Sequence, residues 1–310
     1  MSLTPERVAV LIDAIGVNKI VDYAAVATIT VVWADHMHTL PLEIKHMWTR
    51  RITFAKVLYF LTRYYLLVHS MLWVTYHANE DLTGKLCEFP FARNSVSSQV
   101  TLVLCEAISY IRVYAFSGRN KWLLAFLSVG FVAVNVVTFY YLQRFIKSVS
   151  FLDLPPDARL GCFPGKADGF ALTVIESTLL LSLTIATLIM ICIAIRRRRV
   201  MGGKNRLLQI FYQDGIFYFI SISILAVMNI FIFLLAPGNG IQLLVVQPQV
   251  HFSALLATRM LLHLREWSAK QSVVMITTEV TLDAPNLHFR KSKLTTEAYA
   301  LSDFTVYTQK

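Results

Sequence analysis

The stretch ALTVIESTLLLSLTIATLIMICIAIRRRR, residues 171–199, decides the fold class. Its apolar part, 171–195, carries a single charge, Glu176, and four consecutive arginines follow. About twenty apolar residues cross the hydrocarbon core of a bilayer as a helix, and lysines and arginines beside a span stay in the cytosol. The stretch therefore predicts a transmembrane helix whose C-terminal end faces the cytosol.

The basic run Arg196–Arg199 has a second interpretation, because such runs also bind nucleic acid. Here the run adjoins a span, and no folded basic domain surrounds it. We therefore expect no nucleic-acid partner, and we expect these arginines to set the topology and to contact anionic lipid.

The whole chain fits an all-α, polytopic membrane protein. Of its 310 residues, 56% are hydrophobic and 15% are charged, whereas soluble domains carry about 25% charged residues. Seven stretches are long enough to span, the last of them interrupted by polar residues. They lie at roughly 20–40, 52–76, 95–117, 122–142, 171–195, 215–235 and 243–264.

The basic residues predict the orientation. With the N-terminal segment 1–19 outside, the cytosolic segments hold 18 of the 29 lysines and arginines and the outer segments hold 8. This excess is what the positive-inside rule requires. We expect the tail, 265–310, to be a flexible cytosolic segment, because it is rich in serine and threonine and lacks a long apolar run.

Four cysteines divide by the same topology. Cys105 and Cys192 fall within spans, whereas Cys87 and Cys162 fall in outer segments. Only the outer pair shares an oxidising compartment. We therefore predict a Cys87–Cys162 disulfide that ties the top of the third span to the loop before the fifth.

Charges inside the spans are candidate site residues, because a charge in the membrane interior normally faces a partner or water. By depth, Arg63 and Glu106 lie near the midplane and form the predicted pair. They are either a buried structural pair or a pair that faces a ligand or an ion. Glu176 lies near the outer end of its span, with no arginine at its depth.

A second group of charges lies near the cytosolic ends of the spans. Asp35, Arg112 and Arg259 each lie five residues from such an end, so one carboxylate could bridge two guanidiniums in an inner polar layer. Alternatively, Arg112 and Arg259 extend to the interface by snorkelling.

Motifs for catalysis and metal binding are missing from the sequence. It contains no HExxH, CxxC, G-x-S-x-G, Walker or dinucleotide-binding pattern. We expect no metal and no cofactor, and nothing in the sequence supports an enzyme.

Several segments resemble a family of uncharacterised fungal, mainly basidiomycete, seven-helix membrane proteins that is defined by an N-terminal domain of unknown function. The matching pieces include FAKVLYFLTRYYLLV, RVYAFSGRNK and YQDGIFYF, and the defining segment covers about 20–65. The chain departs from the pattern at Pro41, Leu42 and Thr62. The resemblance implies architecture and no activity. Its pattern positions in this chain are Asp35, Glu43, Arg63, Tyr64, Arg112, Asp214 and Gly215.

A looser resemblance is to rhodopsin-like receptors. Cys87 precedes Arg112 by 25 residues, and YIRVYA is similar to their inner third-span motif. The chain departs from them because no acid precedes Arg112 and no NPxxY-like sequence is present. The resemblance implies receptor-like architecture.

Three functions are compatible with these features. The leading hypothesis is a receptor-like sensor of an external or lipid-borne ligand with a cytosolic signalling partner, in the plasma membrane rather than the endoplasmic reticulum. The alternative is a small transporter or channel that uses Arg63 and Glu106. The third is a membrane enzyme acting on a lipid or isoprenoid substrate, which needs carboxylates that converge at Glu106 or Glu176.

Overall fold

The computed structural model describes residues 5–48, 53–79, 82–118, 120–151, 161–162, 168–201, 206–235 and 244–282. For residues 5–14, 197–201, 206–219, 267–268 and 270–282 it describes the backbone alone.

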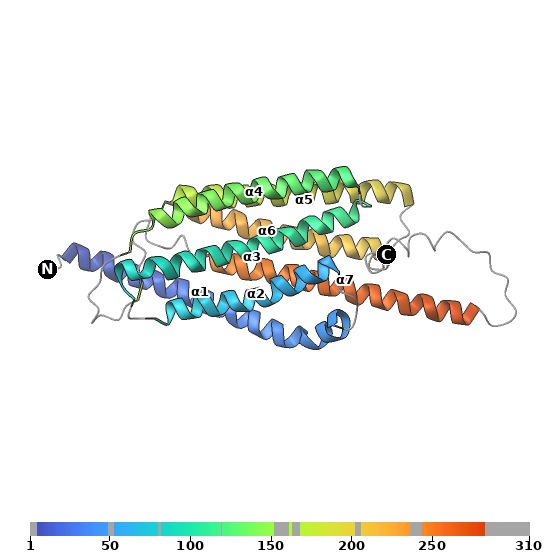
Figure 1. Ribbon diagram of the computed structural model, residues 1–310, viewed down its shortest axis with the longest axis horizontal. Helices are drawn as coiled ribbons and strands as arrows, with labels where there is room; N and C mark the ends of the chain where they lie inside the picture. Colours follow the sequence, from blue (N-terminus) through green and yellow to red (C-terminus); the bar gives the residue numbers. More distant parts are fainter. Residues whose placement is uncertain are drawn as a thin grey trace.

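Helices make up almost all of this described chain, which confirms the all-α prediction. Seven long helices run along one common axis (Figure 1). Two short ones interrupt the connections, the π-helix η1 (Ile44–Trp48) and the 3₁₀-helix η2 (Gly84–Cys87). The long helices are α1 (Pro5–Glu43), α2 (Phe54–His77), α3 (Glu88–Phe116), α4 (Lys121–Ser148), α5 (Gly169–Met201), α6 (Arg206–Leu235) and α7 (Val246–Leu282).

Five of these helical stretches are long and apolar enough to cross a membrane, so the chain has the make-up of an integral membrane protein. The described apolar stretch of α6 is shorter, Ile220–Leu235. In α7 the polar residues Gln249 and His251 are buried in the bundle, and such residues lower its hydropathy. The five stretches are Ile15–Trp48, Phe54–His77, Gly84–Phe116, Lys121–Ser148 and Gly169–Arg196.

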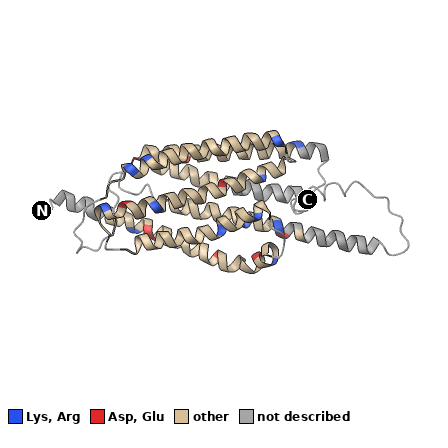
Figure 2. Ribbon diagram, viewed as in Figure 1, with Lys and Arg blue, Asp and Glu red and all other residues tan. Residues whose placement is uncertain are grey.

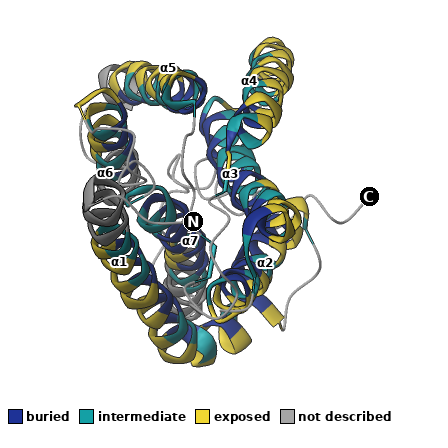
Figure 3. Cartoon of the chain, turned by 90° about the vertical axis from the view of Figure 1, so that its left-hand side faces the viewer, coloured by how far each residue is buried: buried dark blue, intermediate teal, exposed yellow. Residues whose placement is uncertain are grey.

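The bundle surrounds α7. This helix packs against α1, α2, α3 and α6, whereas α4 lies at the edge and packs mainly on α3 and α5. Seen from the end, buried residues face inward and exposed ones face outward (Figure 3). The outward face is apolar, as shown by Val129 and Phe126 of α4, which are 70% and 58% exposed. Lysines and arginines lie mostly toward the two ends of the bundle (Figure 2). An apolar girdle between charged ends is what a bilayer requires.

Two helices continue beyond the predicted spans. The first helix does not stop near residue 40 but continues through Pro41 to Glu43 and into η1. Proline has no N–H to donate to the carbonyl four residues earlier, and the helix then widens into the single π-helical segment η1. At the other end of the chain, α7 continues to Leu282. The first part of the expected flexible tail is therefore helical, and residues 283–310 lie outside the described chain.

Candidate functional site

The predicted Cys87–Cys162 disulfide is confirmed. Its Cα atoms are 5.7 Å apart, and it ties the start of α3 to the segment before α5. We call this end of the bundle the disulfide end and the opposite end the far end. The other two cysteines are free thiols, with Cys105 buried and Cys192 exposed.

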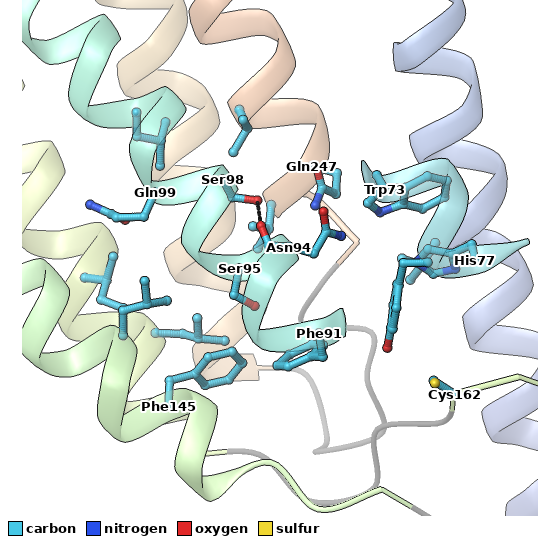
Figure 4. A pocket seen from close by; sticks show the side chains of 18 of the residues that line it. Trp73, His77, Phe91, Asn94, Ser95, Ser98, Gln99, Phe145, Cys162 and Gln247 are labelled. Carbon is cyan, nitrogen blue, oxygen red and sulfur yellow. Dashed lines mark hydrogen bonds between the residues drawn. The ribbon is translucent and has the colours of Figure 1, made fainter. Parts of the chain in front are cut away.

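A cavity of about 120 Å³ opens beneath this disulfide. We call it the disulfide-end cavity. Cys162 lies in its wall, and α1, α2, α3, α4, α5 and α7 supply the rest (Figure 4). Six helices that are distant in sequence thus converge on one space. Among its lining residues are Asn18, Trp73, Tyr76, His77, Phe91, Asn94, Ser95, Ser98, Gln99, Phe145, Glu176, Gln247 and Val250.

Glu176 is the acidic residue in the wall of this cavity. The side chain is 4% exposed, and the described residues that line the cavity include no lysine or arginine. Its described hydrogen-bond partner is the amide of Gln249, whose Nε2 donates to Glu176 Oε2 at 2.8 Å. Gln249 in turn accepts a hydrogen bond from Asn229 of α6. Glu176, for which the sequence offered no arginine at the same depth, is therefore bound by the amide of Gln249.

Asn94 of α3 contributes a second acceptor. The residue is 6% exposed, and its Oδ1 has no hydrogen-bond partner among the described residues. Its side chain lies beside Gln247 at the cavity (Figure 4). A buried amide oxygen without a partner is costly, so this atom calls for a donor that the described residues do not supply.

Aromatic rings form the apolar wall. Phe91 lies 6.1 Å from Phe145 and 6.5 Å from Tyr76, measured between ring centroids. Trp73 stacks on His77 at 3.9 Å, and His77 Nδ1 lies 2.7 Å from Asp22 Oδ1. The cavity thus combines flat apolar surfaces with a few acceptors, which is the usual make-up of a small-molecule site.

Glu106 lies in a second, smaller cavity of about 60 Å³. It accepts hydrogen bonds from Ser182 Oγ at 2.5 Å and from Asn135 Nδ2 at 3.1 Å. The two cavities share Leu102 as a wall residue. The structure therefore does not bring Glu106 and Arg63 together, and the predicted pairing of the two is wrong.

Arg63 is instead bound to Glu43. Its Nε lies 2.5 Å from Glu43 Oε2, and its Nη2 donates to Thr39 Oγ1 at 2.5 Å and to the carbonyl of His36 at 3.2 Å. Asp35 Oδ2 lies 3.9 Å from Nη1. This cation therefore has several partners on α1.

Glu43 likewise has several partners. It is completely buried, and it accepts hydrogen bonds from Tyr64 Oη at 3.0 Å and Trp48 Nε1 at 3.2 Å, and from the more distant Tyr59 Oη at 3.5 Å. We call the set Asp35, Thr39, Glu43, Tyr59, Arg63 and Tyr64 the Arg63 cluster. Because its two carboxylates share the Arg63 guanidinium, the cluster joins α1 to α2.

The predicted inner layer forms in part. Asp35 pairs with Arg259, whose side chain is 55% exposed, so one carboxylate does bridge two guanidiniums. The second is Arg63 rather than Arg112. Arg112 contacts Met260 of α7, and its guanidinium lies 5.6 Å from the ring centroid of Phe116. The side chain of the family-pattern residue Asp214, like Gly215, lies outside the described residues.

Two buried histidines between the cavity and the Arg63 cluster were not predicted as site residues. His69 contacts Ser97 Oγ at 3.0 Å and Gln247 Oε1 at 3.1 Å. His251 contacts Thr28 Oγ1 at 3.3 Å and Ser70 Oγ at 3.4 Å. Their rings are 5.6 Å apart. They connect α1, α2, α3 and α7 directly below the cavity, and the polar interruption of the last apolar stretch was the sequence signal for them.

Residues 23–68 match the model of a family of unknown function (DUF6533). The match confirms the predicted N-terminal defining segment, and it contains the whole Arg63 cluster. Neither curated proteins nor solved structures yield a match to this chain. In this chain the matched segment is a helical hairpin of α1 and α2 joined by buried charges.

Proposed function

We propose that this protein is a receptor-like sensor with seven spans, whose disulfide end faces outside the cell and whose disulfide-end cavity holds a small ligand. The observation that supports it is the cavity itself, which lies under the disulfide-tethered segment and has an amphipathic lining. Its volume approaches that of an engineered apolar cavity of about 150 Å³ that admits benzene. A ligand with a single ring is therefore the expected size.

The seven-span topology in this proposal rests on helix length and charge. α6 and α7 have 30 and 37 residues, and about twenty suffice for a crossing. In this orientation Arg196–Arg199 faces the cytosolic leaflet, where we expect anionic lipid to bind.

α7 is the element that would carry a signal. Gln247 and Val250 of this helix line the cavity, whereas Arg259 and Met260 contact Asp35 and Arg112 nearer the far end. Twelve residues of helix, from Gln247 to Arg259, span about 18 Å. A ligand that shifts α7 would therefore disturb the contacts of Arg112 and Arg259, to which a cytosolic partner could respond.

The rival functions have less support. The transporter hypothesis needed Arg63 and Glu106 at one site, and they lie in different clusters. The enzyme hypothesis needed converging carboxylates, whereas Glu106 and Glu176 line separate cavities.

A distance measurement tests the proposed function. Spin labels are placed at His263→Cys of α7 and Lys121→Cys of α4, with Cys105→Ala and Cys192→Ser in the background, in lipid nanodiscs. We expect single-ring compounds that bind to cause a saturable change in the label-to-label distance. Ser95→Trp, which fills the cavity, should abolish that change. Binding without any change in distance would contradict a sensor and leave only a binding protein.

A further inference from the structure

We propose that the ligand of the disulfide-end cavity is a small, positively charged amine with a compact aromatic or apolar body, and that its ammonium group pairs with Glu176. This inference rests on the proposed function, because it names the ligand class of the same cavity.

The first argument for an ammonium ligand is the charge balance of the cavity. Glu176 is the acid in the wall, and the described lining offers it no lysine or arginine. A carboxylate removed from water needs a counter-charge or several donors, yet Gln249 supplies one hydrogen bond, to Oε2. A bound ammonium would supply both the positive charge and further donors.

The unpartnered side-chain oxygen of Asn94 is a second, independent argument for an ammonium ligand. Its Oδ1 is buried on the α3 side of the cavity without a partner. An ammonium group has three donors and no acceptor, so a site for it should offer acceptors. A carboxylate ligand would meet the opposite situation, with two acceptor groups already in the wall.

The third argument is the set of aromatic rings in the cavity wall. Trp73, Tyr76, Phe91 and Phe145 lie around the space. Their faces pack against an apolar body and also attract a cation by the cation–π interaction. Glu106 in the smaller cavity lacks this setting, because Ser182 and Asn135 already donate to both of its oxygens.

The test compares two probes of one shape. Benzylamine is positively charged at neutral pH, and benzyl alcohol is its neutral counterpart. Apparent dissociation constants come from the dose-dependent shift of the unfolding midpoint of the full chain in nanodiscs. Partitioning into lipid is a property of the probe and cancels between variants. Hydrogen bonds to charged groups contribute about 1.5–3 kcal/mol, so we expect the wild type to prefer the amine by about tenfold to a hundredfold.

Two variants test whether the preference for the amine depends on Glu176. Glu176→Gln should bind the two probes equally. Glu88→Gln removes an exposed carboxylate from the first turn of α3, at the same end but outside the cavity wall, and should retain the full preference. If Glu176→Gln does not fold, the wild type is compared with Ser95→Trp, which fills the cavity and should lose the preference for the amine.

The outcomes separate this inference from the proposed function. Equal binding of the two probes by the wild type, or a preference for the alcohol, overturns the amine proposal and leaves a cavity for neutral ligands. An amine preference that survives in Glu176→Gln also overturns it. If neither probe binds, the amine proposal fails, and the spin-label distances with other ligands decide the proposed function.

Discussion

Glu43 and Glu176 are both buried glutamates in the same helical bundle, but their surroundings are opposite. Glu43 receives the Arg63 guanidinium and the hydrogen bonds of Tyr64 and Trp48. Glu176 receives one amide and otherwise lines a cavity. The difference teaches that burial alone does not mark a site. A carboxylate whose partners are complete holds helices together, whereas one whose partners are incomplete leaves room for a ligand.

Of the changes considered, replacement of Glu43 by glutamine should have the largest effect on stability. Glu43→Gln should lower the free energy of unfolding by about 3 kcal/mol or more, because it leaves the buried Arg63 without its main counter-charge. Unfolding midpoints of purified protein in detergent measure this. Adding Arg63→Gln should cost less than the sum of the two single changes. Strict additivity would show that the Arg63–Glu43 contact does not contribute.

Removal of the disulfide should have the next largest effect, at the cavity end. Cys87→Ser opens a link between residues 75 apart in the sequence and should cost about 2–4 kcal/mol. Reductant should lower the unfolding midpoint of the wild type to that of Cys87→Ser and leave Cys87→Ser itself unchanged. Cys192→Ser is the matched control, because its thiol is free. A wild type insensitive to reductant would contradict the disulfide.

Glu176→Gln is expected to change stability by only about 1 kcal/mol or less. No described cation loses its partner, and a glutamine can still accept the hydrogen bond from Gln249. The measurement is the same as for Glu43→Gln, so the two values compare directly. A loss as large as that of Glu43→Gln would mean that Glu176 has a structural role, and the contrast between the two acids would fail.

Arg259→Ala should have the smallest effect, about 0–1 kcal/mol, although it removes an ion pair with Asp35. The side chain of Arg259 is 55% exposed, and exposed pairs contribute little. Asp35 also retains Arg63 at 3.9 Å. A loss near that of Glu43→Gln would instead make Arg259 part of the Arg63 cluster.

The sequence predicted the features that depend on one-dimensional patterns. Apolar runs predicted the helices. The disulfide Cys87–Cys162 was predicted because only these two cysteines fall in outer segments. Partners of buried charges were harder, because they depend on how far a helix continues and on which face meets a neighbour. The first predicted span ended near residue 40, short of Glu43, and Arg63 was paired with Glu106 by depth. The continuation through Pro41 brings Glu43 to Arg63. Cavities leave no pattern at all, since their walls come from six helices.

The match to residues 23–68 also has a consequence for comparing relatives. None of the described residues that line the disulfide-end cavity falls within that segment. The part of the chain by which relatives are recognised is thus separate from the part that we expect to meet a ligand. A match to residues 23–68 alone therefore says nothing about the shape or charge of this cavity, and it gives no reason to expect a common ligand. Ligand classes in such a group would have to be compared through the positions of Glu176 and Asn94.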